Sequence, residues 1–429
     1  MTRKCAKKPV VRLLKWLRRC LYLMLGLILT YALHQAPPHQ PATPQIQELR
    51  AVWLTNIGAA FLHHTTRLDE AFQHLALLNF NTIYPSVWNR AYTLYPSSLA
   101  QQTTGYRSEP LTMPFQDVLR SLTKQAHRQG LTILPWFEYG LMAPASSGLV
   151  QRHPSWVTQN IEGQKVTHPH SQNSFASYLP APLRNIVFEI TGANQVWLNP
   201  VHPEVQEFIT SLIVEVVRQY DIDGIQLDDH FGWPVTLGYD SYTVKLYQKE
   251  HWSHRPPQDP YDPEWMNWRA RKLTEFMTKI SKAVKAKKPH CIVSLSPNTP
   301  AFAYQEYLQD WQTWASMGII DEAVVQVYRN NRNDLEYELK KLILQQMQQT
   351  QKRIPVSIGL FTGSLRSVQP LAKITEQVKA VRKSGYDGVS FFCWESTLGI
   401  FRKESSQVVQ STFRTLFLTP SYPRSIRAA

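Results

Sequence analysis

From about residue 50 onward, short apolar runs alternate with longer segments of helical periodicity, and this alternation constrains the fold more than any other feature of the chain. Continuous apolar runs are typical of parallel strands that are buried on both faces. Eight runs meet this description: Arg50–Thr55, Thr82–Trp88, Thr132–Tyr139, Gly224–Phe231, Ile292–Asn298, Glu322–Tyr328, Pro355–Phe361 and Gly388–Glu395.

Each run is followed by a segment in which apolar residues recur every three or four positions, as on a helix that lies against a sheet. The helix candidates are Arg67–Leu78, Phe115–Gln129, Pro203–Tyr220, Pro263–Lys287, Tyr304–Met317, Asn333–Gln349, Pro370–Ser384 and Ser405–Leu416. Eight such units predict an α/β domain that forms a single (β/α)8 TIM barrel. A doubly wound open sheet is the alternative, disfavoured because no glycine-rich phosphate turn follows any run.

The longest connection in this pattern covers residues 140–202 and predicts a long insertion after strand 3. Connections of this length inside a compact domain usually carry function. It contains Trp156, His168, His170, Tyr178 and Trp197. These side chains suit a lobe that roofs a sugar-binding cleft, and a solvated insertion is the alternative.

The N-terminus combines basic and apolar sequence. Eight Lys and Arg residues precede the first acidic residue, Glu48, and removing them from the formal charge of +14 leaves +6. The uncharged apolar run Cys20–Leu33 and a Pro/Gln-rich stretch follow, which is the layout of a secretory signal. Residues 13–33 can equally serve as an uncleaved anchor in the inner membrane. We therefore expect an exported, periplasmic or cell-envelope protein that binds no nucleic acid, because its excess charge is topogenic.

These features divide the chain into four parts. We expect a signal peptide or N-terminal membrane anchor over residues 1–34, a Pro/Gln-rich linker over 35–47, the barrel domain over 48–417 and a flexible C-terminal tail over 418–429. The four cysteines form no disulfide framework or metal-binding spacing.

Acidic side chains end three of the predicted strands, which is where a (β/α)8 barrel carries its catalytic groups. Glycoside hydrolysis requires one carboxylic acid and a second carboxylate, roughly 5 to 9.5 Å apart. The candidate catalytic residues are Asp228, Asp229, Glu138 and Glu395.

The segment Asp223–His230 is the most informative of these, because an apolar strand there ends in two adjacent acids. Side chains alternate along a strand, so Gln226, Asp228 and His230 share one face. This polar face is expected to point into the barrel mouth, which favours Asp228 over Asp229 as the nucleophile or stabilising carboxylate. A helix N-cap is the alternative role for Asp229, and a structural ion pair is the alternative for Asp228.

Glu138 and Glu395 are the candidates for the general acid. Each follows an aromatic run, and aromatic neighbours would desolvate the carboxyl and raise its pKa. The residues themselves do not rank one above the other, and a hydrogen-bonded rim position is the alternative for both.

Thirteen tryptophans support a carbohydrate substrate, because sugar rings stack on flat aromatic side chains. Several of them fall at or near strand ends, together with polar side chains. The predicted substrate contacts are Trp53, Asn89, Trp136, His230, Asn298, Gln326, Tyr328 and Trp394. No metal or other cofactor is expected, because no HExxH occurs and the histidine pairs lack carboxylates at ligand spacing. The serine-hydrolase elbow GxSxG is absent as well.

Several co-linear motifs resemble the bacterial glycosyl-hydrolase-like 10 family, formerly a domain of unknown function. The matching stretches are Glu48–Asn56, Leu78–Arg90, Trp197–Pro200 with His202–Val205, and Asp223–His230. The resemblance implies a (β/α)8 fold and an exported enzyme that acts on glycans, with relatives thought to cut peptidoglycan strands that lack stem peptides. It also implies that Asp228 and Asp229 form the acidic fourth strand. Many relatives have Asn at the position of Glu138, which favours Glu395 as the acid.

The sequence therefore predicts a glycoside hydrolase that cleaves a cell-envelope polysaccharide, with the glycan strand of peptidoglycan as its substrate. A catalytically silent barrel that binds cell-wall glycan is the principal alternative. A polysaccharide lyase or transglycosylase would use similar residues and differ in its products.

The division of the chain makes a first prediction. A shortened chain that begins at Gln45 should be folded and soluble, because the apolar segment Cys20–Leu33 is absent and the barrel is complete. Circular dichroism and gel filtration measure this. An insoluble or unfolded product, alongside a full chain that behaves as an ordinary cytosolic protein, would contradict the assignment.

Overall fold

The computed structural model describes residues 15–26, 36–39, 43, 46–56, 58, 68–109, 117–165, 194–345, 347–364, 367–399 and 401–423. Eight parallel strands form one sheet in the order β6-β3-β2-β15-β12-β11-β10-β9, so neighbours in the sheet are also successive barrel strands along the chain. The strands are β2 (Leu49–Leu54), β3 (Thr82–Pro85), β6 (Thr132–Ile133), β9 (Gly224–Asp228), β10 (Ile292–Ser296), β11 (Glu322–Gln326), β12 (Val356–Phe361) and β15 (Gly388–Phe392).

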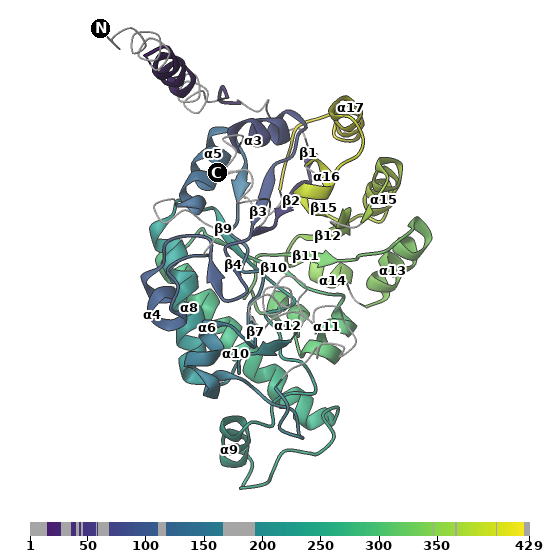
Figure 1. The fold of residues 1–429 in the computed structure, drawn as a ribbon. Helices are drawn as coiled ribbons and strands as arrows, with labels where there is room; N and C mark the ends of the chain where they lie inside the picture. The colour runs from purple at the N-terminus through teal and green to yellow at the C-terminus, as the bar shows by residue number, and fades with distance from the viewer. Residues whose placement is uncertain are drawn as a thin grey trace, which may run out of the picture.

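The sheet closes on itself through a single residue. Trp136 forms parallel bridges with Ser86, beyond β3, and with Gln226 on β9. Its neighbours add backbone hydrogen bonds, from Gln226 N to the Pro135 carbonyl (2.9 Å) and from Phe137 N to the Gln226 carbonyl (2.8 Å). The first and last strands of the sheet order are thereby joined, and the predicted (β/α)8 barrel is confirmed (Figure 1).

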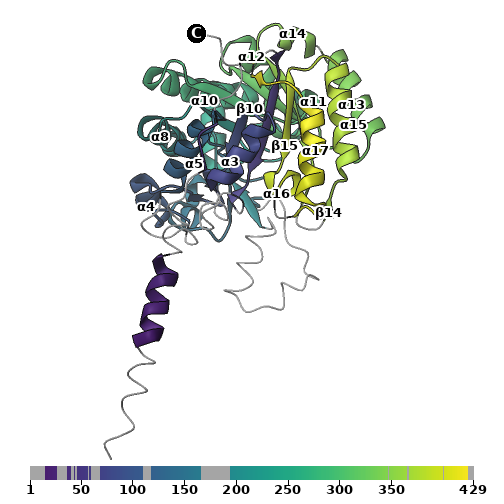
Figure 2. The ribbon, with the colours of Figure 1, turned by 90° about the horizontal axis from the view of Figure 1, so that it is seen from above.

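Helices surround the strands on the outside of the barrel (Figure 2). They are α3 (Leu68–Leu77), α4 (Ser98–Thr104), α5 (Val118–Arg128), α6 (Gly148–Arg152), α8 (Pro203–Gln219), α9 (Ser241–Glu250), α10 (Pro263–Lys287), α11 (Pro300–Tyr307), α12 (Trp311–Ser316), α13 (Arg332–Leu344), α14 (Met347–Gln351), α15 (Leu371–Lys383), α16 (Trp394–Thr397) and α17 (Ser406–Leu416).

Two hydrophobic clusters follow from the alternation of side chains along the strands. The inner cluster fills the barrel and consists of Leu49, Ala51, Trp53, Tyr84, Leu134, Trp136, Ile292 and Val324. The outer cluster is far larger and joins the opposite faces of the strands, such as Val52, Ile225 and Leu227, to the helices. Both faces of every strand are therefore covered, as the continuous apolar runs require.

Three predicted elements differ from those observed. The strand predicted over Thr132–Tyr139 pairs regularly only at Thr132 and Ile133, because Pro135 has no N–H to donate to a ladder. The helix predicted over Tyr304–Met317 is two helices, α11 and α12, since Leu308 takes the left-handed conformation (φ 52°) that ends the first. The segment 333–349 likewise divides into α13 and α14.

The connection after β6 contains short elements in its described part. The hairpin of β7 (Met142–Pro144) and β8 (Gln195–Trp197) is antiparallel, and α6 and the 3-10 turn η1 (Pro154–Trp156) lie between these strands in sequence. Residues 166–193, including His168, His170 and Tyr178, lie outside the described residues.

The two ends of the domain meet at the N-terminal end of the barrel strands. Strand β16 (Ser421–Tyr422) pairs in parallel with β1 (Ile46–Gln47), and the Glu48 N–H donates to the Tyr422 carbonyl at 2.9 Å. Strand β1 lies within the predicted linker over 35–47 and β16 within the predicted tail over 418–429, and each satisfies backbone hydrogen-bonding groups of the other.

Residues 15–26 are helical, with exposed apolar side chains that include Leu17, Leu23 and Leu25. Among the described residues, no helix combines the length and the apolar character needed to cross a bilayer.

A buried ion network at the base of the barrel makes the next prediction. Glu48 accepts from the Arg50 guanidinium (2.6 Å) and from that of Arg382 (2.6 and 2.9 Å), and the Arg50 side chain is 1% exposed. Glu48→Gln would leave buried guanidinium charge unpaired, so the free energy of unfolding should fall by about 3–5 kcal/mol. Urea denaturation measures it. The exposed pair of Arg332 with Glu336 provides the control, since Glu336→Gln should leave stability unchanged.

Candidate active site

Strand β9 delivers Asp228 to the mouth of the barrel as a buried carboxylate. Its side chain is 1% exposed. One oxygen accepts from the Trp136 indole N–H at 2.9 Å and the other from the His230 backbone N–H at 2.9 Å. Burial raises the pKa of Asp228 to about 6, although the positive charge of His230 opposes that rise.

The chain turns immediately after Asp228, because the Phe231 N–H donates to the Asp228 carbonyl at 3.1 Å. The strand alternation therefore ends there, and Asp229 does not point away from the mouth. It is half-buried and accepts from the side-chain amides of Asn298 (3.0 Å) and Gln326 (2.9 Å), which follow or end the neighbouring strands β10 and β11. No helix begins at Asp229, so it is not the helix N-cap that was the alternative for it.

His230 joins this turn to the segment after β6. Its Nδ1 lies 2.7 Å from the Glu138 carbonyl, to which it donates, and 3.4 Å from an Asp228 carboxylate oxygen. The ring lies between those of Tyr139 and Trp197, with centroids 5.9 and 6.2 Å away. Burial lowers the pKa of His230, but the carboxylates of Asp228 and Asp229 outweigh it and raise the pKa to about 10. His230 is therefore an imidazolium at neutral pH.

Glu138 is half-buried in the segment that follows β6. Its Oε2 accepts from the Ser86 hydroxyl at 2.9 Å and from the Asn89 amide. Burial raises the pKa of Glu138 to about 7, the hydrogen bonds from Asn89 and Ser86 lower it, and the charge of Asp228 raises it further. A carboxyl with this pKa can hold a proton near neutral pH and give it up, as a general acid must.

Glu395 does not end a strand, contrary to the prediction. Strand β15 stops at Phe392, and Glu395 lies in the first turn of α16 with no exposed surface. One carboxylate oxygen accepts from the Thr55 hydroxyl at the end of β2, and the other has no hydrogen-bond partner among the described residues. A group buried to this degree has no free surface to offer to a sugar.

The predicted tryptophans Trp53, Trp136 and Trp394 lie in two different clusters. Trp136 lies in the inner cluster below the mouth, 4% exposed. Trp53 is 1% exposed beside it, with ring centroids 6.4 Å apart, and its indole N–H donates to Gln226 at 2.6 Å. Trp394 belongs to the outer cluster instead. The structure thus does not gather these three side chains into one open cleft.

Half-buried aromatic side chains do occur at the ends of three adjacent strands. Tyr328 and Phe392 have ring centroids 5.8 Å apart, and Phe361 lies 5.7 Å from Tyr328 and 6.3 Å from Phe392. Burial, and then the charges of Asp229 and Asp228, raise the pKa of Tyr328 well above its ordinary value. Of these three residues, only Tyr328 was predicted from the sequence, because an aromatic residue at a strand end can equally well belong to the hydrophobic core.

Residues on other elements hold the acids through hydrogen bonds, and the sequence did not predict them. Gln309, which precedes α12, donates its amide to the carbonyls of Asp228 (2.9 Å) and Phe231 (3.0 Å). Arg90 donates to Asn89 at 2.9 Å and to Glu109 at 2.7 Å, and so continues the network beyond Glu138. No sequence signal marks Gln309, because its contact spans 81 residues.

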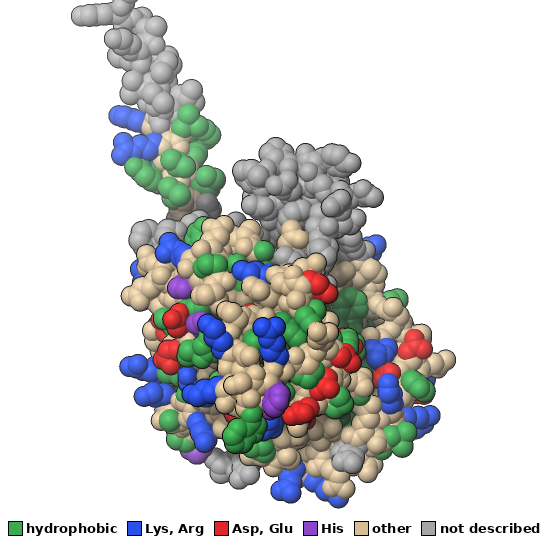
Figure 3. All heavy atoms as spheres, turned by 90° about the horizontal axis from the view of Figure 1, so that it is seen from below, with side chains coloured by type: hydrophobic (Ala, Val, Ile, Leu, Met, Phe, Trp, Pro, Cys, Tyr) green, Lys and Arg blue, Asp and Glu red, His purple; other side chains and the backbone are tan. Residues whose placement is uncertain are grey.

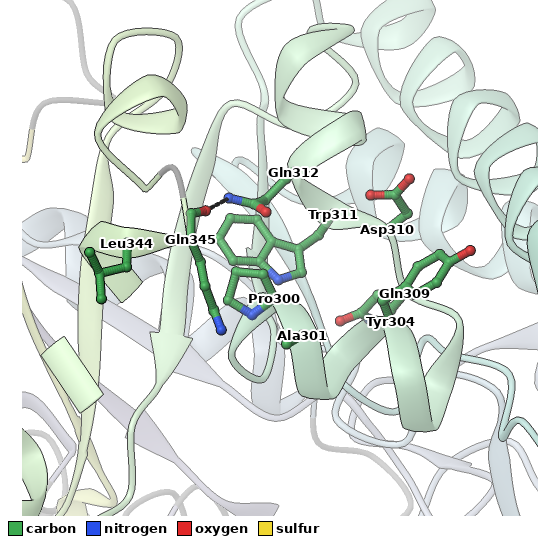
Figure 4. Close-up of a pocket in the computed structure, with 9 residues that line it drawn as sticks. All are labelled: Pro300, Ala301, Tyr304, Gln309, Asp310, Trp311, Gln312, Leu344 and Gln345. Atoms are coloured by element: carbon green, nitrogen blue, oxygen red, sulfur yellow. Dashed lines mark hydrogen bonds between the residues drawn. The ribbon is translucent and has the colours of Figure 1, made fainter. Parts of the chain in front are cut away.

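A hollow of about 430 Å³ lies on the flank of the barrel beside α11 and α12 (Figure 4). Its lining residues are Pro300, Ala301, Tyr304, Gln309, Asp310, Trp311, Gln312, Leu344 and Gln345. Gln309 lines this hollow and also donates to the Asp228 carbonyl, but none of the candidate acids lines the hollow. We therefore assign the site to the barrel mouth.

Asp228, Asp229 and His230 also place one potential metal ligand each within 4.8 Å of one another. Both Asp228 oxygens and His230 Nδ1 are already engaged in the hydrogen bonds given above. The arrangement is therefore explained by hydrogen bonds between these protein groups.

A closed (β/α)8 barrel with carboxylates at its mouth is an arrangement that TIM-barrel glycoside hydrolases use. The profile of the glycosyl hydrolase-like 10 family matches residues 48–380, and the chain belongs to that family. It is 23% identical to the glycosyl hydrolase DigH of Escherichia coli K12 over 381 residues, which cover 80% of this chain and 81% of DigH. It is 22% identical to the glycosyl hydrolase YngK of Bacillus subtilis, covering 66% of this chain and 54% of YngK.

Solved structures share the fold. The glycoside hydrolase domain of PgaB (BpsB) from Bordetella bronchiseptica superposes with a TM-score of 0.60 at 13% identity, covering 86% of this chain and 99% of that domain. The β-galactosidase of Rahnella sp. R3 gives a TM-score of 0.57 at 12% identity, covering 89% of this chain and 58% of that enzyme.

The raised pKa of Glu138 makes a prediction about stability. Because the folded protein holds this proton more tightly than the unfolded chain does, the contribution of Glu138 to stability falls as pH rises from about 4.5 to about 7. Glu138→Gln cannot titrate, so the variant should lose less stability than the wild type over that range. Denaturant unfolding measured below, within and above this range tests the point. If the free energies of unfolding of the two proteins change with pH in parallel, the pKa of Glu138 is not raised in the folded state.

Proposed function

We propose that this glycoside hydrolase cleaves a polysaccharide of the cell envelope, the glycan strand of peptidoglycan, by two-carboxylate chemistry at the barrel mouth. The observation that carries the proposal is the link between Glu138 and the Asp228–Asp229 turn: His230 donates to the Glu138 carbonyl at 2.7 Å, and burial raises the pKa of the Glu138 carboxyl to about 7. The charge of Asp228 contributes to that pKa, so the acids of the two segments interact electrostatically.

In the proposed reaction, protonated Glu138 donates its proton to the glycosidic oxygen as the bond from that oxygen to the anomeric carbon breaks. An ionised aspartate of the pair stabilises the positive charge that develops on the sugar ring. Water supplies the hydroxyl group that is added to the anomeric carbon, and its remaining proton passes to a carboxylate. The reaction thus consumes one water molecule and returns one proton to a carboxylate of the site.

The aromatic side chains near the acids support a sugar ligand. Tyr328, Phe361 and Phe392 are half-buried at adjacent strand ends, and sugar rings pack their C–H faces against such rings. Asn298 and Gln326 add amides beside Asp229. The choice of peptidoglycan rests on the resemblance of the sequence motifs to relatives that are thought to cut peptide-free strands.

The N-terminus supports a location in the envelope. Residues 15–26 are helical and carry exposed Leu side chains next to Arg18 and Arg19, so they can be recognised by an export pathway or lie at a membrane surface. We propose that residues from about 45 onward face outside the inner membrane.

Scattered charge on the face shown in Figure 3 supports a polysaccharide over a nucleic acid. On the face shown in Figure 3, Lys and Arg side chains are interspersed with Asp and Glu and form no continuous basic surface. Nucleic-acid sites instead gather positive charge on one face or stripe.

The proposed function predicts the behaviour of Glu138→Gln. Release of soluble fragments from purified peptide-free peptidoglycan strands should fall by about 100-fold to 10,000-fold, because the amide cannot donate the proton that a general acid supplies. Glu306→Gln, which alters an exposed carboxylate on α11, should keep full activity.

Cleavage of the strands at equal rates by the wild type and Glu138→Gln would refute the assignment of the acid. Binding of the strands by the wild type without any cleavage would favour the catalytically silent barrel.

A further inference from the structure

The two adjacent acids of the mouth differ in their access to solvent. Asp228 is 1% exposed, whereas Asp229 is half-buried, as is Glu138. A carboxylate that stabilises or attacks the anomeric carbon must contact the substrate directly. Solvent access alone therefore favours Asp229 over Asp228 as the residue that contacts the substrate.

Hydrogen bonding separates them in the same way. The two Asp228 oxygens accept from N–H groups of the protein, those of Trp136 and His230, and its main-chain carbonyl accepts from Gln309. A buried carboxylate with these partners is an internal anchor, since removal of either donor leaves polar groups unsatisfied.

Asp229 is held in a way that leaves it able to bind. Each of its oxygens accepts one side-chain amide, from Asn298 and Gln326, and a carboxylate oxygen has a second lone pair. The two amides come from different strand ends, so they fix the plane of the carboxylate. Burial, and then the charge of Asp229, raise the pKa of both Tyr307 and Tyr328.

We propose that Asp229 is the carboxylate that contacts the glycan opposite Glu138, and that Asp228 with His230 is a positioning pair. The positioning pair fixes the turn that carries Asp229 and, through the bond from His230 to the Glu138 carbonyl, holds that turn against the segment that carries the acid. This division of roles rests on the proposed glycosidase function, and it reverses the preference for Asp228 that strand alternation gives.

Accessibility can be tested without any glycan. Carbodiimide activation in the presence of glycine methyl ester converts reachable carboxylates of the full chain to amides, and peptide fragmentation distinguishes adjacent residues. Asp229 should be modified while Asp228 stays unmodified in the folded protein. Modification of Asp228 and protection of Asp229 would overturn the proposal.

Two matched variants test the roles. Asp228→Asn places an amide N–H against the Trp136 N–H or the His230 N–H, so the melting temperature should fall by several degrees. Asp229→Asn opposes the amide of Asn298 or Gln326 in the same way, but Asp229 is half-buried and water can reach the displaced groups, so the melting temperature should fall less than for Asp228→Asn. Its kcat on peptide-free strands should nevertheless fall about a thousandfold with KM little changed. Trp136→Phe removes the same hydrogen bond from the other side and replaces Asp228→Asn if that variant does not fold.

The outcomes distinguish this inference from the proposed function. If Asp229→Asn keeps wild-type kcat while Asp228→Asn of normal stability is inactive, the roles are the reverse of those proposed. If the wild type does not cleave the strands, the proposed substrate is wrong. The labelling pattern and the melting temperatures then decide whether Asp229 is the accessible acid and Asp228 the anchor.

Discussion

Trp136 connects the closure of the barrel to the chemistry of its mouth. Its backbone bridges Ser86 and Gln226, which joins the two ends of the sheet order, and its indole N–H donates to Asp228. Pro135 interrupts the regular ladder just before this point, so closure depends on a few contacts. The residue that completes the fold therefore also satisfies the most deeply buried acid of the site.

The electrostatics of the mouth follow from burying several acids near one cation. In addition to burial, the charge of Asp228 raises the pKa of Glu138 and the charge of Asp229 raises that of Asp228, while the imidazolium of His230 lowers both. Burial and repulsion hold the pKa of Glu138 near 7. In the proposed reaction, this arrangement supplies a proton donor at Glu138 and a nearby aspartate that stabilises the charge on the sugar, the two groups that glycoside hydrolysis requires.

The support of these acids is spread widely along the chain. Gln309 precedes α12, Asn89 lies in the short strand β4 (Trp88–Asn89), and Ser86 follows β3. Each fixes one acid by a hydrogen bond rather than by charge. These neutral donors orient a carboxylate without adding a charge to the mouth of the barrel.

The sequence by itself predicted the barrel, because eight apolar runs that alternate with helices require strands buried on both faces, and the absence of a glycine-rich phosphate turn disfavoured a doubly wound open sheet. It also placed Asp228, Asp229 and Glu138 at the strand ends, where hydrophobic patterning gives way to acids. It could not determine which side chains face substrate, since alternation holds only while a strand lasts and the chain turns at Asp228.

Only the tertiary structure decided that Glu395 is enclosed in α16, that Trp394 packs outward and that Asp229 lies between Asn298 and Gln326. These outcomes depend on contacts between residues far apart in the chain, and such contacts leave no periodic trace in the sequence.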